Sequence, residues 1–174
     1  CSSWLGIGRA GQLQRCIDSR FGGHGMNHNP LPMVSVAGNL SYPPRLSDFT
    51  QTFWNGLRTG QWQTTCCEDC KKVTFPPKPV CPHCWSPRVS WQPLGSKGVL
   101  YSWTRVHAAP AVFASESPYA VGIVDLTEGV RLACRLVTAE GVALNPGMPV
   151  EMVVLQYEDG PLFAARPVLA SQEN

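Results

Sequence analysis

Cysteines are concentrated in residues 66–84, CCEDCKKVTFPPKPVCPHC, and this cluster constrains the fold more than any other feature of the chain. Cys67 and Cys70 form one C-x2-C pair, and Cys81 and Cys84 form a second. Two such pairs supply the four thiolates that a tetrahedral zinc ion binds at about 2.3 Å. The spacing therefore predicts a zinc ribbon that holds one structural Zn²⁺ per chain through Cys67, Cys70, Cys81 and Cys84.

Other uses of the cluster differ in the ligands that they need. A catalytic zinc keeps an open coordination position, which four thiolates do not leave. A redox dithiol needs one C-x2-C pair rather than two. Iron of the rubredoxin type takes the same four thiolates, so spacing alone does not separate iron from zinc. Cys66 and His83 are the competing ligands, and we prefer Cys67 to Cys66 because its two-residue spacing matches the second pair.

Basic side chains outnumber acidic ones around the predicted ribbon. The basic residues are Lys71, Lys72, Lys78, Arg88 and Lys97, and the acidic ones are Glu68 and Asp69. One interpretation is a solvated basic face. The more specific interpretation is a binding site for phosphate groups. Both interpretations stay open at the level of sequence.

The rest of the chain predicts one helix and a small barrel, so the fold class is mainly β. An apolar stripe predicts a helix over 45–60, with Ser47 or Asp48 as its cap and Gly60 at its end. From Gly98 onward the apolar pattern has a period of two. The five runs are 99–107, 119–126, 130–138, 150–157 and 161–168. Five short antiparallel strands suit a closed OB-fold barrel, with a small open sandwich as the alternative.

These patterns divide the chain into six segments. They are an unstructured leader (1–25), an extended proline-containing arm (26–44), the helix (45–60), the zinc ribbon (61–97), the OB-fold (98–168) and a tail (169–174). The leader either precedes a native start at Met26 or is a genuine flexible extension. Because a short helix is marginal alone, its stripe must pack on its own chain or on a partner. We expect the barrel to leave part of that stripe uncovered, as a contact for a partner.

Charge and hydropathy disfavour several classes of partner. The formal net charge is +2, and it arises entirely within residues 1–25, because the remaining residues carry equal numbers of basic and acidic side chains. Such a body has no overall field that attracts nucleic acid or an anionic membrane. No apolar run approaches the roughly 20 residues that cross a bilayer. With two C-x2-C pairs that favour metal over disulfides, we predict a cytoplasmic protein.

The first barrel run carries the residues that look most like a site outside the ribbon. Tyr101, Trp103, Arg105 and His107 alternate along it, as in surfaces that stack single-stranded nucleic acid. We favour instead that Tyr101 and Trp103 fill the barrel or its contact with the helix. His107 has no carboxylate or nucleophile near it in sequence, so it is weak evidence for a catalytic base.

Two further segments of the barrel region carry expectations. Cys134 lies in step with Val130, Leu132 and Leu136, which predicts a small buried core residue. The loop 108–118 is long for a barrel connection, so it is a candidate contact surface.

The order of these parts resembles a known family. The helix segment FTQTFWNGLRTGQW (49–62), the ribbon segment FPPKPVCPHC (75–84) and the hairpin LTEGVRL (126–132) carry the resemblance. They look like the acyl-CoA-associated zinc-ribbon and OB-fold proteins, long catalogued as a domain of unknown function. The match covers residues 43–167 and departs from the family pattern at Cys66 and at Trp85, where a smaller residue is usual.

The resemblance implies an accessory subunit bound to an acyl-CoA enzyme: a thiolase-like acyltransferase, an aldolase of thiolase type or a hydratase. It implies that this subunit helps to hold CoA and to shape the substrate channel, while the catalytic residues belong to the partner. We then expect the ribbon's lysines and Arg88 to take CoA phosphates, and Trp85 to stack on adenine or lie in an interface. The competing hypotheses are a single-stranded nucleic-acid module and a self-sufficient thioesterase or acyltransferase that uses His107.

Overall fold

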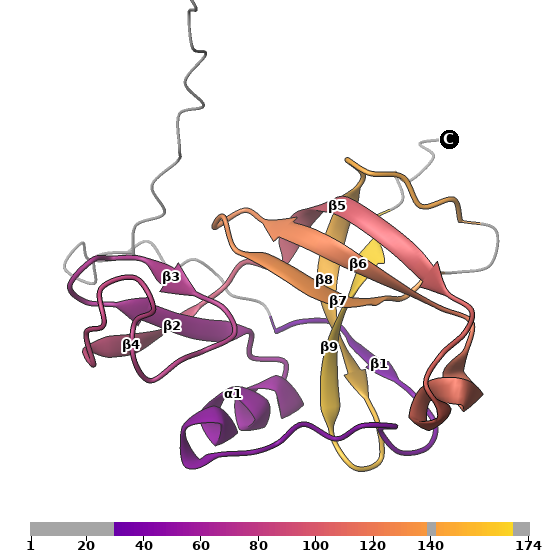
Figure 1. Ribbon diagram of the computed structural model, residues 1–174, viewed down its shortest axis with the longest axis horizontal. Helices are drawn as coiled ribbons and strands as arrows, with labels where there is room; N and C mark the ends of the chain where they lie inside the picture. The colour runs from indigo at the N-terminus through magenta and orange to yellow at the C-terminus, as the bar shows by residue number, and fades with distance from the viewer. Residues whose placement is uncertain (1–29, 139–141, 169–174) are drawn as a thin grey trace, which may run out of the picture.

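The computed structural model describes residues 30–138 and 142–168, so the predicted leader and tail lie outside the described residues (Figure 1). These ranges contain the α-helix α1 (Asp48–Arg58) and the 3₁₀ helix η1 (Ala111–Glu116). The strands are β1 (Met33–Ser35), β2 (Gln63–Cys67), β3 (Val73–Thr74), β4 (Val89–Pro93), β5 (Lys97–Val106), β6 (Tyr119–Leu126), β7 (Arg131–Leu136), β8 (Pro149–Gln156) and β9 (Pro161–Pro167). The mainly β class is therefore confirmed. Within the described ranges, neither helix has the length and hydrophobicity to cross a bilayer.

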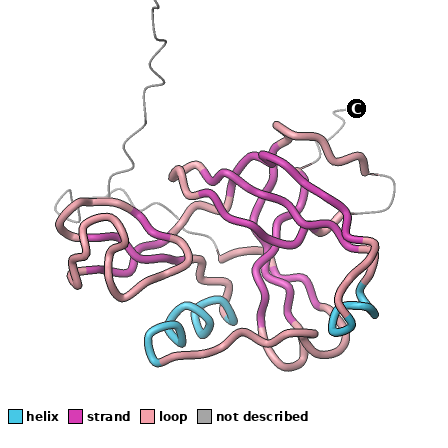
Figure 2. The backbone as a smooth tube through the Cα atoms, in the orientation of Figure 1, coloured by secondary structure: helices cyan, strands magenta, loops and turns pink. Residues whose placement is uncertain are grey.

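Strands β5 to β9 form the predicted barrel, and each lies close to its predicted run (Figure 2). The sheet runs β8-β5-β6-β7-β9, and β9 also pairs with β8, which closes it. All neighbours in this ring are antiparallel except β7 and β9, which are parallel. The open sandwich is therefore wrong and the closed OB-type barrel is confirmed.

The proline-containing arm supplies a strand that the sequence pattern did not predict. β1 pairs in parallel with β8, with Met33 opposite Val154. It occupies the edge of β8 beyond Glu151, where the pairing of β8 with β5 ends. Further along the arm, the Leu40 N–H donates to the Asp159 carboxylate at 2.8 Å. The described part of the arm is therefore tied to the barrel at both points.

Both aromatic side chains of β5 are exposed, so their predicted role inside the barrel is wrong. The pairing with β6 shifts register between Leu100 and Ser102, so the alternation of faces slips at Tyr101. Tyr101 is 54% exposed and lies beneath the Arg131 guanidinium, 3.8 Å from the ring centre. Trp103 is 37% exposed. Neither ring fills the barrel. Tyr101 is exposed like Val99 before it, whereas the bulge changes the face of Trp103, which pairs with the buried Gly122.

Helix α1 begins at the predicted cap and packs between the ribbon and the barrel (Figure 1). The Ser47 side chain accepts a hydrogen bond from the Thr50 N–H at 3.2 Å, and the Thr50 hydroxyl accepts one from the Ser47 N–H at 2.8 Å. Phe53 and Leu57 on the apolar stripe are buried. Leu46, the first residue of the predicted stripe, is 57% exposed, so part of the stripe is uncovered as expected.

An aromatic cluster packs around Phe53 of this stripe and joins all three parts of the fold. Its members are Phe53 and Trp54 of α1, Trp62 and Phe75 of the ribbon region, and Phe163 of β9. The ring centroids of Phe53 lie 5.1 to 6.2 Å from those of the other four. Contacts at these separations bury large apolar areas. The ribbon and the barrel therefore share one hydrophobic core through α1.

Candidate metal centre

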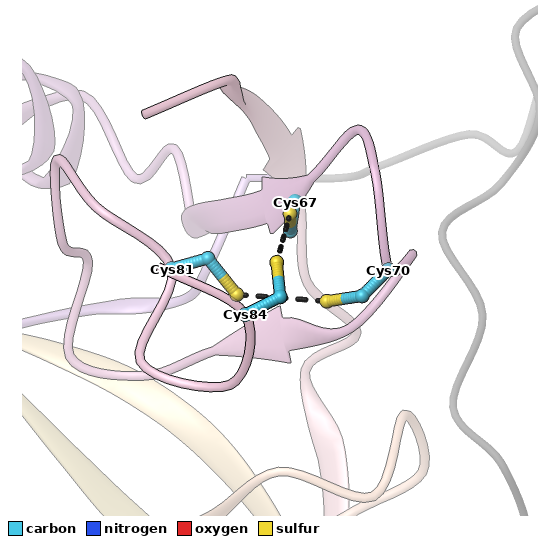
Figure 3. Close-up of side chains that lie close together, drawn as sticks. All are labelled: Cys67, Cys70, Cys81 and Cys84. Atoms are coloured by element: carbon cyan, nitrogen blue, oxygen red, sulfur yellow. Dashed lines mark hydrogen bonds between the residues drawn. The ribbon is translucent and has the colours of Figure 1, made fainter. Parts of the chain in front are cut away.

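The ribbon presents its cysteines on two matching turns beside the sheet β3-β2-β4 (Figure 3). In the first turn, the Lys71 N–H donates to the Cys67 carbonyl at 3.0 Å. In the second turn, the Trp85 N–H donates to the Cys81 carbonyl at 2.9 Å. The residue after each pair, Lys71 or Trp85, has left-handed backbone with φ of 58° or 61°. These equivalent turns place the sulfurs of each pair on one side, facing the other pair.

The four predicted ligands come together in space. The Sγ atoms of Cys67, Cys70, Cys81 and Cys84 all lie within 4.8 Å of one another. The Sγ atoms of Cys67 and Cys84 are 3.5 Å apart, as are those of Cys70 and Cys81 (Figure 3). Four sulfurs at about 2.3 Å from a tetrahedral ion lie about 3.8 Å from one another. The sulfur arrangement therefore fits a single tetrahedral metal ion.

The surroundings of the sulfurs also fit a bound cation. The backbone N–H of Ser86 lowers the pKa of Cys84, but burial and hydrogen bonds with Cys67, Cys70 and Cys81 raise that pKa by more, to about 12. Four adjacent thiolates repel one another unless a cation balances them, and a metal displaces their protons on binding. The His83 N–H donates to the Cys81 sulfur at 3.4 Å, which supports a negative charge there.

The other candidate ligands lie outside the sulfur cluster. His83 is exposed, and the four-cysteine group does not include its side chain. Cys66 is also not a member of the group, and it is buried in β2 where it pairs with Val73 and Ser90. Cys134 is a buried core residue as predicted, and burial raises the pKa of its thiol to about 12.

The predicted phosphate-binding residues differ in whether their charge is available. Lys71, Lys72 and Lys78 are exposed, and none has an ion pair with a described residue. Arg88 instead pairs with Asp69, and its Nε donates to Oδ2 at 3.2 Å. Lys97 begins β5 and lines a cavity between the ribbon and the barrel. The structure thus separates the predicted set into three ribbon lysines, one neutralised arginine and one lysine at the cavity.

Trp85 combines exposure with an unfavourable backbone conformation. Its side chain is 80% exposed, although it follows directly after Cys84. A left-handed backbone costs a residue other than glycine about 1–2 kcal/mol. An exposed tryptophan at such a position does not stabilise the fold of the chain itself. This favours a role for Trp85 in contact with a ligand or a partner protein.

We expect Trp85→Gly to raise the free energy of unfolding of the metal-loaded protein by about 0.5–1 kcal/mol, because glycine adopts positive φ without strain. Urea denaturation with matched metal loading measures the change. Trp85→Ala is the control, since it removes the same ring and keeps the strain. Equal stability of the glycine and alanine variants would contradict the strain argument.

The cavity beside Lys97 is the feature that sequence reasoning missed. It measures about 940 Å³ and lies where the turn after α1, the end of β4 and the β6–β7 hairpin meet. Its residues come from four separate stretches of the chain. Among them, only Lys97 was a candidate binding residue in the sequence analysis. No spacing or motif connects such stretches, so only the tertiary structure reveals the cavity.

A rubredoxin-like zinc ribbon followed by an OB-fold barrel is the class of protein that this fold and metal site define. Residues 54–90 match the family model described as "ChsH2, rubredoxin-like zinc ribbon domain". Residues 91–155 match the model described as "ChsH2, C-terminal OB-fold domain". The chain belongs to this family, whose members are also described as DUF35 proteins.

Three similar proteins illustrate the family. A "DUF35 domain-containing scaffold protein" of Methanocaldococcus jannaschii is 34% identical over 97 residues, which cover 54% of this chain and 68% of that protein. A "probable enoyl-CoA hydratase alpha subunit" of Thermomonospora curvata is 36% identical over 113 residues, 62% of this chain. The match spans only 34% of that hydratase subunit, about a third of its length.

The third is the solved structure of the "Ltp2-ChsH2(DUF35) aldolase". It superposes with a TM-score of 0.64 and 30% sequence identity, covering 73% of this chain and all of the matched chain. The similarity therefore extends over both the ribbon and the barrel.

Proposed function

We propose that this chain is an accessory subunit that assembles with an acyl-CoA enzyme and helps to hold the CoA portion of its substrate. The observation that carries the proposal is the four-sulfur site, which leaves no coordination position for a substrate. The imidazole of His107 is exposed and has no hydrogen bond with a described residue, so it lacks the partner of a catalytic base. With four thiolates in the metal site and no such pair at His107 among the described residues, we assign the chemistry to another subunit.

The names of the related proteins support the class of partner. One relative is named as a subunit of an enoyl-CoA hydratase, and one solved structure is of an aldolase that includes a DUF35 chain. By this analogy the partner is a hydratase or an enzyme of thiolase type, either an aldolase or an acyltransferase. A cytoplasmic location belongs to the same proposal, because a thiolate cluster needs a reducing compartment.

The loop 108–118 is the surface that we assign to the partner enzyme. It contains η1, which has no buried residue, and Val112 at its centre is exposed. Glu116 holds the loop in place by accepting from the Ser41 hydroxyl and pairing with Arg135. A rigid apolar loop with no role in the core suits protein binding, because little entropy is lost on association.

The three ribbon lysines and Trp85 are the residues that we assign to the nucleotide end of CoA. Lys71 and Trp85 each directly follow a cysteine pair of one sulfur cluster, so both lie at the metal-site end of the ribbon. The ammonium groups, which have no ion pair with a described residue, offer charge for phosphates, and the exposed indole offers a face for adenine. Arg88 contributes less than expected, because Asp69 already neutralises it.

Native mass spectrometry of the protein isolated from its own cells tests the subunit assignment. We expect one zinc per chain and a companion chain with the mass of a thiolase-type enzyme or a hydratase. A metal-loaded chain that comes out alone, or with nucleic acid, would overturn the assignment. The same sample separates zinc from iron, because an iron site with four thiolates absorbs visible light and zinc does not.

Calorimetric titration with CoA tests the ligand assignment, on the chain alone and with its partner. We expect Lys72→Glu to weaken CoA binding at least about tenfold, because it replaces a charge-assisted contact with repulsion. Arg45→Glu is the matched control, since Arg45 is an exposed cation outside the ribbon. Equal losses in both variants would show a general charge effect, and no heat with the wild type would remove the ligand assignment.

A further inference from the structure

The cavity between the ribbon and the barrel is held open by hydrogen bonds between its own walls. The Leu31 N–H donates to the Gly60 carbonyl, and the Leu94 N–H donates to the Trp62 carbonyl, both at 2.9 Å. Glu128 on the β6–β7 hairpin accepts from the Gly95 N–H at 2.7 Å. These bonds connect every segment around the cavity. A site held in this way is formed before a ligand arrives.

The walls combine apolar surface with neutral amides. Trp62, Trp91 and Leu94 give apolar surface, and Gln61, Gln63 and Gln92 carry amide groups. The Gln63 Nε2 donates to the Thr52 carbonyl at 3.3 Å, whereas the side chains of Gln61 and Gln92 have no hydrogen bond within the described residues. A side-chain amide both donates and accepts, so it is complementary to an amide in a ligand.

Charge limits the kind of ligand that the cavity accepts. Among the described residues that line it, only Lys97 and Glu128 are charged. Glu128 accepts from Gly95 and from the Thr127 hydroxyl, the latter at 3.1 Å, and it has no ion pair in the described chain. Lys97 also has no described ion pair and is exposed. One cation beside one carboxylate suits a ligand with a single anionic group and disfavours a polyanion.

We propose that this cavity binds an elongated ligand that carries amide groups along its length and one anionic group at its end, which Lys97 contacts. The inference rests on the proposed function, in which such a ligand is the phosphopantetheine arm of a CoA thioester. The nucleotide end of CoA, with its several phosphates, then lies outside this cavity.

Nuclear magnetic resonance of the metal-loaded full chain tests the inference with two halves of CoA as separate probes. We expect 4′-phosphopantetheine to shift the side-chain amide signals of Gln61 and Gln92 and the backbone signal of Gly95. We expect adenosine 3′,5′-bisphosphate to leave these three signals unchanged. The bisphosphate should instead shift the signals of Lys71 and Trp85 if the proposed nucleotide site is correct.

A variant that fills the cavity provides the specific test. Ser96 lines the cavity, and its carbonyl already accepts from the Met152 N–H, so Ser96→Trp adds a ring without removing that bond. We expect this variant to weaken phosphopantetheine binding at least about tenfold, because the ring occupies the ligand volume. Ser35→Trp, at an exposed serine of β1 outside the cavity, should bind like the wild type.

The outcomes separate this inference from the proposed function. If cavity signals do not shift at about 1 mM phosphopantetheine, or if Ser96→Trp binds as well as the wild type, the cavity assignment is overturned. In either case CoA binding or a companion enzyme would still support the accessory-subunit proposal. If neither half of CoA shifts any signal and no companion enzyme is found, both proposals fail together.

Discussion

Cys81→Ser is expected to abolish metal binding and unfold the ribbon. Cys81 is buried at the centre of the sulfur cluster, and its N–H also donates to the Ser86 carbonyl at 2.9 Å. Structural zinc contributes roughly 10–16 kcal/mol to the folding of zinc-finger peptides, comparable with the whole stability of a domain. The strands β2, β3 and β4 form a small sheet that has little core of its own apart from the aromatic cluster. Without the metal we expect it to lose its structure.

Metal analysis and amide hydrogen exchange measure this effect. The metal content should fall from one ion per chain to nearly none, and amides of β2 and β4 should exchange quickly while those of β6 and β7 stay protected. Cys134→Ala is the control, since Cys134 is a buried thiol of the barrel outside the cluster. A Cys81→Ser protein that keeps its metal and its protected ribbon amides would contradict the assignment.

The second large effect is expected for Phe53→Ala, which removes the ring at the centre of the aromatic cluster. Phe53 is 3% exposed, and its ring contacts aromatic rings from α1, the ribbon region and β9. A buried phenylalanine replaced by alanine costs about 3–5 kcal/mol, and the higher part of this range applies where neighbours cannot collapse into the space. We expect such a loss in the free energy of unfolding from urea denaturation.

The aromatic cluster also predicts how unfolding changes. Because Phe53 joins the ribbon to the barrel, the variant should unfold in two transitions, with the ribbon and α1 separating from the barrel first. Phe113→Ala is the control, since the only ring within contact distance of Phe113 in the described chain is Tyr119. A loss below about 1 kcal/mol for Phe53→Ala, or a transition as cooperative as that of the wild type, would show that the two parts do not depend on this contact.

Local patterns in the sequence were sufficient to predict helix α1 and the five barrel strands. The helix cap at Ser47 and the five barrel strands follow from side chains within a few residues of one another. The metal ligands follow from spacing, because a C-x2-C pair constrains both cysteines to one turn. In each of these cases the physical cause lies within a single segment, where periodicity and turn chemistry act directly.

The features that the sequence did not predict correctly depend on distant segments or on a single irregular residue. The strand β1 forms because part of the edge of β8 is not paired with β5. No pattern within the arm predicts that this edge is available for pairing. One bulge shifts every later side chain of β5 relative to its partner strand, so the period of two in the sequence does not predict the face on which Trp103 lies. Arg88 loses its available charge to Asp69, whose distance from it depends on how the two turns meet.

What the sequence by itself determined about this protein is a set of local structures and the four cysteines of its candidate metal site. Cys67, Cys70, Cys81 and Cys84 define that site through spacing alone, and their sulfurs lie within 4.8 Å of one another in the fold. Only the tertiary structure decided that Phe53 and Leu57 of α1 pack against the ribbon and the barrel, which lysines keep an available charge, and that a cavity opens beside Lys97. The physical reason is that packing, ion pairing and cavities depend on contacts between segments far apart in the chain, which local periodicity does not encode.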